Sequence, residues 1–429
     1  MAEAMPMVAS KDIAPVAGRR QRVLFHVTHF LHGGIETSLV SLLASLDPEH
    51  FELGLTITYP SPELESHFRA RLPAHVKVHV LAPERWLSHC RQLKKQRKLG
   101  PLGKIYEEAL LPPVRKPLMR RRFLSILKQG GPGGYDAVVD YDMSLSRITG
   151  PLAVPMIGYQ HFSVAHLADG HERKLRKLRH QCKVDYDAVV LLTDSMLADA
   201  RVLLPDAADK LVRLYNAIDI ANIRTRAQQP LEPGVTPQGP FIVSVGRLEE
   251  SQKDFASLLH AYARLAGQGI AEDLVIVGDG ASRQHLEALA QSLGIASRVT
   301  FAGFQSNPHA WIGHARLLAF SSKMEGLPNV LLEGLAAGQV VVSTDCPTGP
   351  REILDDGRAG LLVPVGDVAG LAEAIDRGLH DEALRAALLA HAAHHIEQMG
   401  FGPTAQAFSA LVDRLTRQAA SPAGAAARA

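Results

Sequence analysis

The stretch "RLLAFSSKMEGLPNVLLEGLAAGQVVVSTDCP", residues 316–347, places a helical segment between two short apolar runs. The runs "RLLAFSS" and "VVVSTDCP" have the length and the turn-residue borders of buried β-strands. Between them, Pro328 suits the first turn of a helix, because the N–H that proline lacks has no partner there. A buried strand, a helix and a second buried strand predict two parallel strands joined by a crossover helix.

The same alternation extends along the chain on both sides of this unit. Buried strands are also expected at "FIVSVGRL" (241–248), "DLVIVGDG" (273–280), "RVTFAGF" (298–304) and "GLLVPVGD" (360–367). Before them, "RVLFHVTHF" (22–30), "FELGLTITY", "KVHVL", "DAVVDYD", "PMIGYQHF", "DAVVLLT" and "LVRLYNAID" (211–219) repeat the pattern. The segment "RAQQPLEPGVTPQGP" is rich in Pro, Gln and Gly and marks a boundary. The predicted fold class is therefore α/β, with two Rossmann-like, doubly wound parallel-sheet domains facing across a cleft.

The predicted boundaries follow from this pattern. Residues 1–20 are expected to be a disordered leader, residues 21–215 the N-terminal domain and residues 216–398 the C-terminal domain. A helix over about 400–416 is expected to pack back on the N-terminal domain, and residues 417–429 are expected to form a flexible tail.

Composition limits the classes of protein to which the chain can belong. Its 429 residues, 46% apolar and 21% charged, suit a soluble globular protein with two cores. Cys90, Cys182 and Cys346 lie far apart and form no CxxC pair, which argues against a disulfide framework and a zinc site and suits a reducing cytosol. The N-terminus lacks the apolar core of a secretory signal, and no run of 18 apolar residues is present to span a membrane.

The net charge of +2 is unevenly distributed along the chain. Residues 85–128 hold 13 Lys and Arg against two Glu, mixed with large apolar residues, and "HERKLRKLRHQCK" (171–183) holds six against one. Such mixtures favour a helix on an anionic membrane surface, and a solvated helix face is the alternative for either cluster. Nucleic acid is a weaker interpretation, because no recognition motif accompanies the charge. The expected location is the cytoplasm, peripheral on the cytoplasmic face of the inner membrane.

Ligands of parallel sheets bind beyond the carboxyl ends of the strands. Those positions hold, in chain order, Gly33, Gly34, Gly246, Arg247, Lys253, Gly280 and Glu325. Glycine lets the backbone approach a ligand closely, helix N-termini attract phosphate, and arginine and lysine neutralise a diphosphate. None of these turns carries GxGxxG, the fingerprint of dinucleotide binding.

Two glutamates flank the start of the helix predicted in residues 316–347. Glu325 is expected in the loop before it and Glu333 about one turn inside it. The free N–H groups at Leu327, Asn329 and Val330 are expected to point towards whatever Glu325 faces. One carboxylate can bind the vicinal hydroxyls of a ribose, the other can contact a sugar ring, and the helix start between them can receive phosphate.

These motifs resemble those of family-4 retaining glycosyltransferases of the GT-B fold, including members that build bacterial surface polysaccharides. "EGLPNVLLEGLAAG" resembles their Glu-x7-Glu signature, "VGRLEESQKDF" their Arg-x5-Lys phosphate clamp, and "VGDG" with Arg283 their second strand–loop. "GGIE" (33–36), "LYNAID" and "STDCPTGPREIL" (343–354) are similar to their glycine loop, their domain crossing and a later strand–loop–helix. The resemblance spans about residues 22–416 and is stronger in the C-terminal domain than before residue 200.

The resemblance implies a role for each matching residue. Glu333 would bind the ribose of a donor, Glu325 would contact the transferred sugar, and Arg247 and Lys253 would neutralise the leaving diphosphate. His161, in "GYQHFS", would face the donor sugar and the acceptor. The remaining donor-binding positions would be Gly33, Gly34, Gly246, Gly280, Phe304, Gln305, Gly326, Leu327, Pro328 and Asn329. No cofactor and no metal is implied.

The pattern departs from the family in two places, and other interpretations stay open. Asp254 stands where the family often has Gly, and residues 85–128 match nothing in it, which leaves the acceptor unidentified. Histidines 26, 29 and 32 compete with His161 for its role, and each acidic or basic site residue has a surface charge as its alternative. "HAAHHIEQ" has the helical spacing of a metal site without a supporting carboxylate or Cys pattern, and Cys346 is expected to pack rather than act as a nucleophile.

The sequence thus predicts a metal-independent hexosyl- or N-acetylhexosaminyl-type glycosyltransferase. Its donor would be a nucleotide diphosphate-sugar, with a UDP-sugar favoured, and its acceptor a glycan or a lipid-linked sugar in lipopolysaccharide, capsule or exopolysaccharide synthesis. Retention of configuration is implied by the resemblance. The alternatives are a sugar-nucleotide epimerase of the same architecture, a non-catalytic nucleotide-sugar-binding subunit, and an NAD-dependent oxidoreductase, which would need the missing fingerprint.

Overall fold

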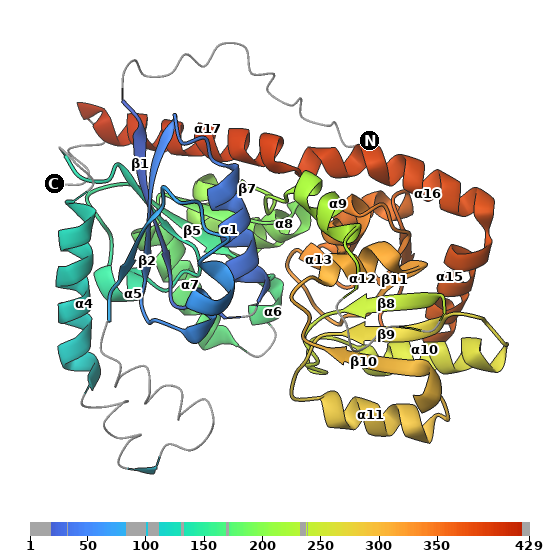
Figure 1. The fold of residues 1–429 in the computed structure, drawn as a ribbon. Helices are drawn as coiled ribbons and strands as arrows, with labels where there is room; N and C mark the ends of the chain where they lie inside the picture. Colours follow the sequence, from blue (N-terminus) through green and yellow to red (C-terminus); the bar gives the residue numbers. More distant parts are fainter. Residues whose placement is uncertain are drawn as a thin grey trace.

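The computed structural model describes residues 19–31, 33–82, 100–101, 111–129, 133–168, 171–231, 237 and 239–422. Its strands form two separate sheets, of seven and six strands, and every strand pair in both sheets is parallel (Figure 1). The chain has two doubly wound α/β domains, and the predicted fold class is confirmed.

The N-terminal sheet has the strand order β3-β2-β1-β4-β5-β6-β7. Its strands are β1 (Gln21–Val27), β2 (Phe51–Ile57), β3 (Lys77–Val80), β4 (Ala137–Asp140), β5 (Met156–Gln160), β6 (Ala188–Leu191) and β7 (Leu211–Arg213). The order reverses between β1 and β4, so the loops that follow these two strands diverge and leave a crevice at the carboxyl edge of the sheet.

The C-terminal sheet repeats this order as β10-β9-β8-β11-β12-β13. Its strands are β8 (Phe241–Val245), β9 (Asp273–Val277), β10 (Val299–Gly303), β11 (Leu317–Phe320), β12 (Val341–Thr344) and β13 (Leu361–Val363). The reversal lies between β8 and β11. The predicted strand–helix–strand unit at residues 316–347 consists of β11, α13 (Asn329–Ala336) and β12, and it borders this crevice. Pro328 immediately precedes α13 instead of lying in its first turn.

Helices cover both faces of each sheet. Those of the N-terminal half are α1 (Gly34–Ser45), α4 (Leu111–Leu127), α5 (Ser146–Thr149), α6 (Ala165–Ala168), α7 (Glu172–His180), α8 (Asp194–Leu203) and α9 (Ile220–Ala227). Those of the C-terminal half are α10 (Phe255–Gly267), α11 (Arg283–Ser292), α12 (Pro308–His314), α14 (Pro350–Ile353), α15 (Val368–His380), α16 (Glu382–His395) and α17 (Phe401–Ala420). Single turns of 3₁₀ or π-helix lie at η1 (Leu64–Phe68), η3 (Gln181–Asp185), η4 (Pro205–Lys210), η5 (Ala296–Arg298), η6 (Asp355–Gly357) and η7 (Ile396–Met399).

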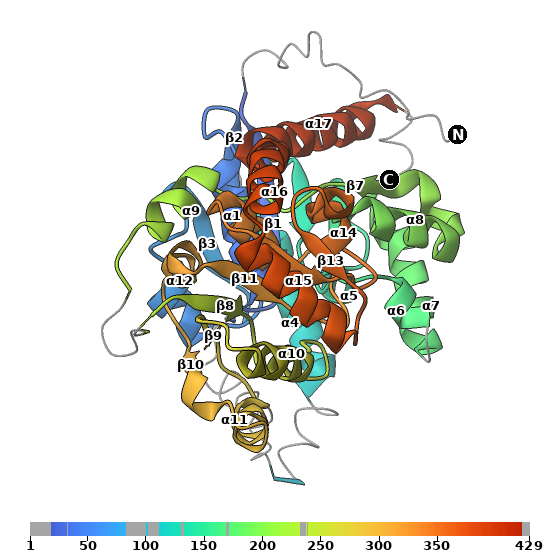
Figure 2. The same cartoon turned by 90° about the vertical axis from the view of Figure 1, so that its right-hand side faces the viewer.

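The strands are buried because helices shield both of their faces, which is why they appear as continuous apolar runs. Phe25 of β1 is fully buried, and its ring stacks on that of Phe408 with the centroids 5.7 Å apart. Phe408 belongs to α17, which leaves the C-terminal half and runs along the top of the N-terminal domain (Figures 1 and 2). The last helix therefore ties the two halves together. In the part of the chain that the structure describes, no helix combines the length and the apolar character needed to cross a bilayer.

Candidate active site

The loops that follow β8 and β11 pair with each other at the reversal point of the C-terminal sheet. Lys253 and Ser322 form an antiparallel bridge, the N–H of Lys323 donates to the carbonyl of Gln252 at 2.8 Å, and that of Asp254 donates to Ser321 at 3.1 Å. The pairing fixes the loop after β8 against the loop after β11. It thereby brings Lys253 next to a carboxylate that is far away in the sequence.

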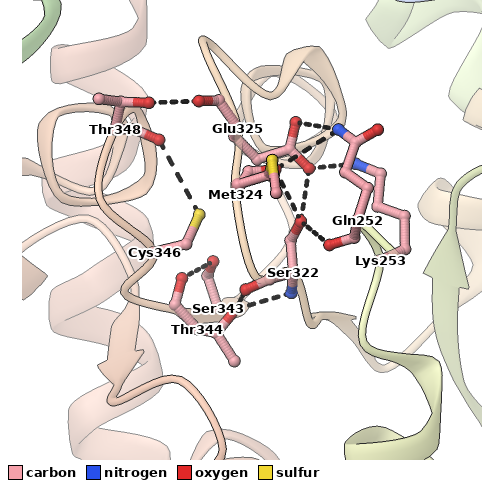
Figure 3. A network of polar contacts seen from close by, with 9 residues as sticks. All are labelled: Gln252, Lys253, Ser322, Met324, Glu325, Ser343, Thr344, Cys346 and Thr348. Atoms are coloured by element: carbon pink, nitrogen blue, oxygen red, sulfur yellow. Dashed lines mark hydrogen bonds and ion pairs between the residues drawn. The ribbon is translucent and has the colours of Figure 1, made fainter. Parts of the chain in front are cut away.

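That carboxylate is Glu325, and both of its oxygens are occupied (Figure 3). Oε1 forms an ion pair with Lys253 Nζ and accepts a hydrogen bond of 2.7 Å from Ser322 Oγ. Oε2 accepts from Gln252 Nε2 at 3.3 Å. Lys253 Nζ also lies 4.6 Å from the centre of the Phe320 ring, in a cation–π arrangement. Glu325 is thus a fixed anion rather than a mobile loop charge.

The backbone around Glu325 is held by two threonines, one at the end of β12 and one in the loop that follows it (Figure 3). Thr344 Oγ1 donates to the carbonyl of Ser322 at 2.9 Å and accepts from its N–H at 2.8 Å, and Thr348 Oγ1 donates to the carbonyl of Glu325. Cys346 lies beside them and is buried, and burial raises the pKa of its thiol to about 12. The thiol is therefore protonated at neutral pH, which makes Cys346 a packing residue in this site.

Glu333 lies on α13 one turn after its start, with its side chain only 16% exposed. His309 Nε2 of α12 is 3.7 Å from its Oε1. Burial by itself raises the pKa of Glu333, but the hydrogen bond and charge of His309 and the charges of Arg71 and Arg226 together lower it below the ordinary value. The carboxylate is therefore an anion in a basic surrounding. Arg71 belongs to the N-terminal domain, so both domains contribute to this surrounding.

The loop after β1 is organised by Glu36, in the first turn of α1. Its Oε1 accepts a hydrogen bond of 3.1 Å from the N–H of Leu31, and a side chain at Gly33 would collide with its other oxygen. Burial raises the pKa of Glu36, and the charge of Arg247 partly offsets this effect from the C-terminal domain. A side chain at Gly33 would therefore have to displace the Glu36 carboxylate, while Gly34 is exposed beside Asn329.

Arg247 is exposed, and its side chain makes no ion pair or hydrogen bond with another residue in the described ranges. Its charge acts on Glu36 from the C-terminal half. Lys253, predicted to share the role of Arg247, is already paired with Glu325. The two predicted phosphate cations therefore differ: one is committed to a carboxylate and the other is available to an anion.

His161 directly follows β5, and one hydrogen bond fixes which ring nitrogen carries the proton. Nε2 lies 2.6 Å from the carbonyl oxygen of Tyr141, which only accepts, so Nε2 carries the proton. Burial lowers the pKa of His161 to about 4, which makes the ring neutral at pH 7 and leaves Nδ1 as an acceptor. Its competitor His26 is fully buried between the hydroxyls of Thr56 and Thr58. Of the other two competing histidines, His29 and His32, His32 lies outside the described residues.

The remaining predicted positions differ in what surrounds them. Gly280 packs over the backbone of Leu248, so its lack of a side chain has a structural reason. Phe304 is 49% exposed, and its ring centre is 5.0 Å from that of His67 of the other domain. The side chain of Gln305 is used inside the C-terminal domain, where it donates to a backbone carbonyl and accepts from Trp311 Nε1.

The segment from Gly326 to Asn329 lies where the domains meet. A side chain at Gly326 would overlap the carbonyl oxygen of His161, and the Asn329 amide donates to the carbonyl of Gly34 at 3.2 Å. Leu327 and Pro328 between them are buried. Gly246 lies against the Lys253 side chain, with an added Cβ 3.8 Å from its Cε. Of the predicted positions, Gly326, Asn329 and Phe304 thus contact the other domain directly.

For several residues of this site, nothing in the sequence indicated a functional role. His309, Arg71 and Arg226 belong to no motif, while Gln252 and Ser322 lie within quoted stretches without a predicted role; each acts on a glutamate through the packing of separate elements. Within the described ranges, no group of three or more His, Cys, Asp or Glu is arranged to hold a metal ion. In "HAAHHIEQ", His391 Nε2 instead pairs with Asp355 Oδ2 at 2.6 Å.

Comparison with known proteins agrees with the fold and with the C-terminal motifs. Residues 239–381 match the family model described as glycosyl transferases group 1. The chain is 40% identical over 174 residues to N-acetylgalactosamine-N,N'-diacetylbacillosaminyl-diphospho-undecaprenol 4-alpha-N-acetylgalactosaminyltransferase of Campylobacter jejuni, covering 41% of this chain and 46% of the relative. It is 38% identical over 172 residues to the lipopolysaccharide core biosynthesis glycosyltransferase LpsE of Rhizobium meliloti, covering 40% and 46%. The chain thus spans just under half the length of these curated relatives.

Solved structures match over nearly the whole chain. HepE of Anabaena, crystallised with UDP and glucose, superposes with a TM-score of 0.69 at 18% identity, covering 92% of this chain and all of HepE. WaaG, a glycosyltransferase involved in lipopolysaccharide biosynthesis, superposes with a TM-score of 0.63 at 18% identity, covering 92% and 99%. At this identity the likeness establishes the fold, which is GT-B.

Proposed function

We propose, from the premise that this chain has the GT-B fold and a C-terminal domain matching the group 1 glycosyl transferases, that it is a glycosyltransferase. Its donor is a nucleotide diphosphate-sugar, with a UDP-sugar favoured, and its acceptor is a glycan or a lipid-linked sugar of bacterial surface polysaccharide. The undecaprenol-linked acceptor in the name of the Campylobacter jejuni relative, the role of LpsE in lipopolysaccharide core biosynthesis and the UDP bound to HepE support this choice.

The observation that carries the proposal is the arrangement of charge at the C-terminal reversal point. Arg247 is available to an anion, while Lys253 and Glu325 form a fixed pair beside it and Glu333 is held as an anion on the helix that follows. A diphosphate needs the first feature, a sugar the second and a ribose the third. The site thus combines a largely buried carboxylate that has donors on both oxygens with an arginine, on the loop of the neighbouring strand, whose guanidinium has no hydrogen bond or ion pair in the described ranges.

The proposed reaction moves the sugar with retention and without a metal ion. The bond between the anomeric carbon and the diphosphate oxygen breaks, the acceptor oxygen bonds to that carbon on the same face, and the acceptor proton passes to the departing diphosphate. Arg247, Lys253 and the start of α13 neutralise the diphosphate as it leaves. Glu325 contacts the sugar but is not a nucleophile, because Lys253, Ser322 and Gln252 already engage its oxygens. Neutral His161 accepts a hydroxyl hydrogen bond at Nδ1.

The proposed location is the cytoplasmic face of the inner membrane, held there by an anionic lipid surface. Of the predicted basic stretch 85–128, residues 85–99 and 102–110 lie outside the described residues, and residues 111–127 form α4. Lys116, Arg120, Arg121 and Lys128 line an open groove of about 750 Å³ along α4, and no described carboxylate pairs with them. Leu118, 67% exposed, adds an apolar contact. Anionic phospholipid headgroups complement such a surface.

Two measurements test the proposal. In the first, melting temperatures are recorded with UDP-, GDP- and ADP-sugars at concentrations well above the dissociation constant, where binding adds roughly 2–4 kcal/mol to the free energy of unfolding. A rise with a UDP-sugar supports the donor, and no rise with any nucleotide-sugar overturns the proposal. A Glu325→Ala variant that binds the donor and leaves all activity unchanged would indicate a non-catalytic binding subunit instead.

In the second, flotation with vesicles of phosphatidylglycerol is compared with flotation on phosphatidylcholine. The triple variant R120A/R121A/K128A is expected to lose binding to the anionic vesicles. A matched triple variant of exposed arginines on α8, α10 and α15, R201A/R264A/R377A, removes the same charge outside both predicted basic clusters and separates a specific surface from total charge. Equal loss in both variants would show that only the total charge matters.

A further inference from the structure

The side chain of Asn329 is hydrogen-bonded in two directions at the junction of the domains. Its Nδ2 donates to the carbonyl of Gly34 at 3.2 Å, and its Oδ1 accepts from Asn216 Nδ2 at 2.8 Å. Asn216 lies between β7 and α9, where the chain first crosses between the domains, and is 5% exposed. One amide therefore joins the glycine loop (residues 33–36), the crossing segment and the start of α13.

This use of the amide is not the usual one at a helix start. Asparagine there commonly bonds back to the free N–H groups of its own helix. Here α13 has no side-chain cap, and both partners of Asn329 belong to other segments. Asn216 in turn has no other side-chain hydrogen bond in the described ranges, because its Oδ1 is buried without a partner. The bond from Asn329 to Gly34 and the bond from Asn216 to Asn329 therefore share one side chain, so a shift of either partner affects both bonds.

The position of this amide matters for the proposed reaction. The glycine loop and the start of α13 are the two backbone segments expected to face the donor diphosphate, one from each domain. A planar amide offers its donor and acceptor in fixed directions, so both bonds form together only when the loop and the crossing segment have one relative placement. The adjacent contact of Gly326 with the carbonyl of His161 requires the same placement.

We infer that the side chain of Asn329 is a positioning residue, which holds the glycine loop against the start of α13 and so assembles the diphosphate site from both domains. The inference rests on the proposed function for its consequence in turnover. The coupling of the glycine loop to the start of α13 is independent of the proposed function, because the two hydrogen bonds form without any ligand. The backbone N–H of Asn329 is unaffected by substitution, so a direct backbone contact to phosphate is retained in every variant.

The test begins with hydrogen exchange in the ligand-free protein. Asn329→Ala is expected to speed exchange several-fold in residues 33–45, because both bonds are lost. Asn329→Asp keeps the acceptor for Asn216 and loses the donor to Gly34, and is expected to speed exchange in the same residues. It also places a negative charge at a helix N-terminus, which favours folding if the alanine variant is unstable. Asn216→Ala is expected to have a smaller effect on residues 33–45.

Asn307→Ala is the matched control, since the Asn307 amide also bonds to other segments, donating to the Arg226 carbonyl and to Gln229 and accepting from Arg226 Nε, but these bonds do not involve the glycine loop. It is expected to change exchange in α9 and not in residues 33–45. In turnover, Asn329→Ala is expected to lower kcat/KM for the donor by about tenfold or more, beyond any change in melting temperature.

Three results would overturn the inference. They are unchanged exchange of residues 33–45 in Asn329→Ala, an equal change in Asn307→Ala, or faster exchange with kcat/KM left at the wild-type value. If the wild-type chain binds no nucleotide-sugar, the proposed function fails separately, and the exchange measurements alone then decide the coupling.

Discussion

Lys253 and Glu325, which stand 72 residues apart in the sequence, form an ion pair with side chains only 14% and 8% exposed. Opposite charges removed from water together depend on each other, because either one alone would be left in a poorly solvated place. A diphosphate that reaches Lys253 therefore has to share its ammonium with Glu325, whereas Arg247 has no such commitment to a described residue.

The first prediction concerns the stability of this pair. Lys253→Met is expected to lower the free energy of unfolding by about 2–4 kcal/mol, because Glu325 is left without its cation. The double variant K253M/E325Q is expected to regain part of this loss without regaining activity. Chemical denaturation measures both. Lys183→Met serves as control, since Lys183 and its partner Asp206 are 59% and 67% exposed and the loss of this pair should cost less than about 1 kcal/mol. A double variant no more stable than Lys253→Met would contradict the pairing.

Arg247 is expected to act on turnover rather than on stability. Arg247→Ala should lower kcat/KM by about 10²–10³, the effect of removing one preorganised group that stabilises developing charge. Its melting temperature should stay near that of the wild type, because the Arg247 side chain makes no described hydrogen bond or ion pair. Steady-state kinetics and a melting curve test the two parts. Arg264→Ala, an exposed arginine on α10, should leave both unchanged; a similar loss there would point to a general charge effect.

The pKa of Glu333 predicts a shift in the pH dependence of donor binding. This pKa is lowered in the folded protein, so its contribution to stability is present above the ordinary carboxyl range and is lost as the pH falls through the folded value. His309→Ala removes the hydrogen bond and charge that lower it, and burial then raises it. Calorimetric titration of the donor between pH 4.5 and 8 should show the acid loss of affinity at a higher pH in His309→Ala. In His314→Ala, on the same helix, the acid limb should match the wild type.

His161 also predicts a pH dependence of stability, but here the group is a base that is buried in its neutral form rather than an acid that is held as an anion. Its pKa is lowered from 6.5 to about 4, so between these values the unfolded chain binds more protons than the folded one. The free energy of unfolding therefore decreases as the pH falls from 6.5 towards 4 and is unaffected by this group above 6.5. In His161→Asn the slope in this window should be smaller by about 1 kcal/mol per pH unit. Urea denaturation at pH 5, 6 and 8 measures it, and an unchanged slope would show that His161 is not buried as a neutral ring.

A side chain added at position 326 is expected to block the approach of the two domains. In Gly326→Ala the new methyl group would overlap the carbonyl oxygen of His161, so the domains have to separate. The expected result is a larger radius of gyration in small-angle scattering and a loss of about 10² in kcat/KM, with the C-terminal domain folded. Gly267→Ala, where an added Cβ meets nothing within 4 Å, is the control and should be neutral or slightly stabilising. Wild-type compactness in Gly326→Ala would mean that the contact is not part of closure.

Local patterns were sufficient for the architecture. Runs such as "FIVSVGRL" and "DLVIVGDG" are apolar along their whole length because helices cover both faces of each sheet, and this property is written into consecutive residues. The alternation with helical segments then implies parallel strands, and parallel strands place their following loops on one edge. For this reason Arg247, Lys253 and Glu325 could be assigned to a common edge before any coordinates were available.

Pairing between distant residues was beyond such patterns. That Lys253 is bound to Glu325 and Arg247 is not, that His309 supports Glu333, and that Asn329 bridges to Gly34 all depend on how the loops of separate strands and the two domains pack. The same holds for the Gln305 side chain, which is used inside its own domain. Periodicity reports the environment of neighbouring residues along one element, whereas these contacts are set by distances between elements that are far apart in the chain. The sequence therefore determined the sheet edge that holds the candidate site, because strand order along the chain sets that edge, and only the tertiary structure decided which partner each charge has.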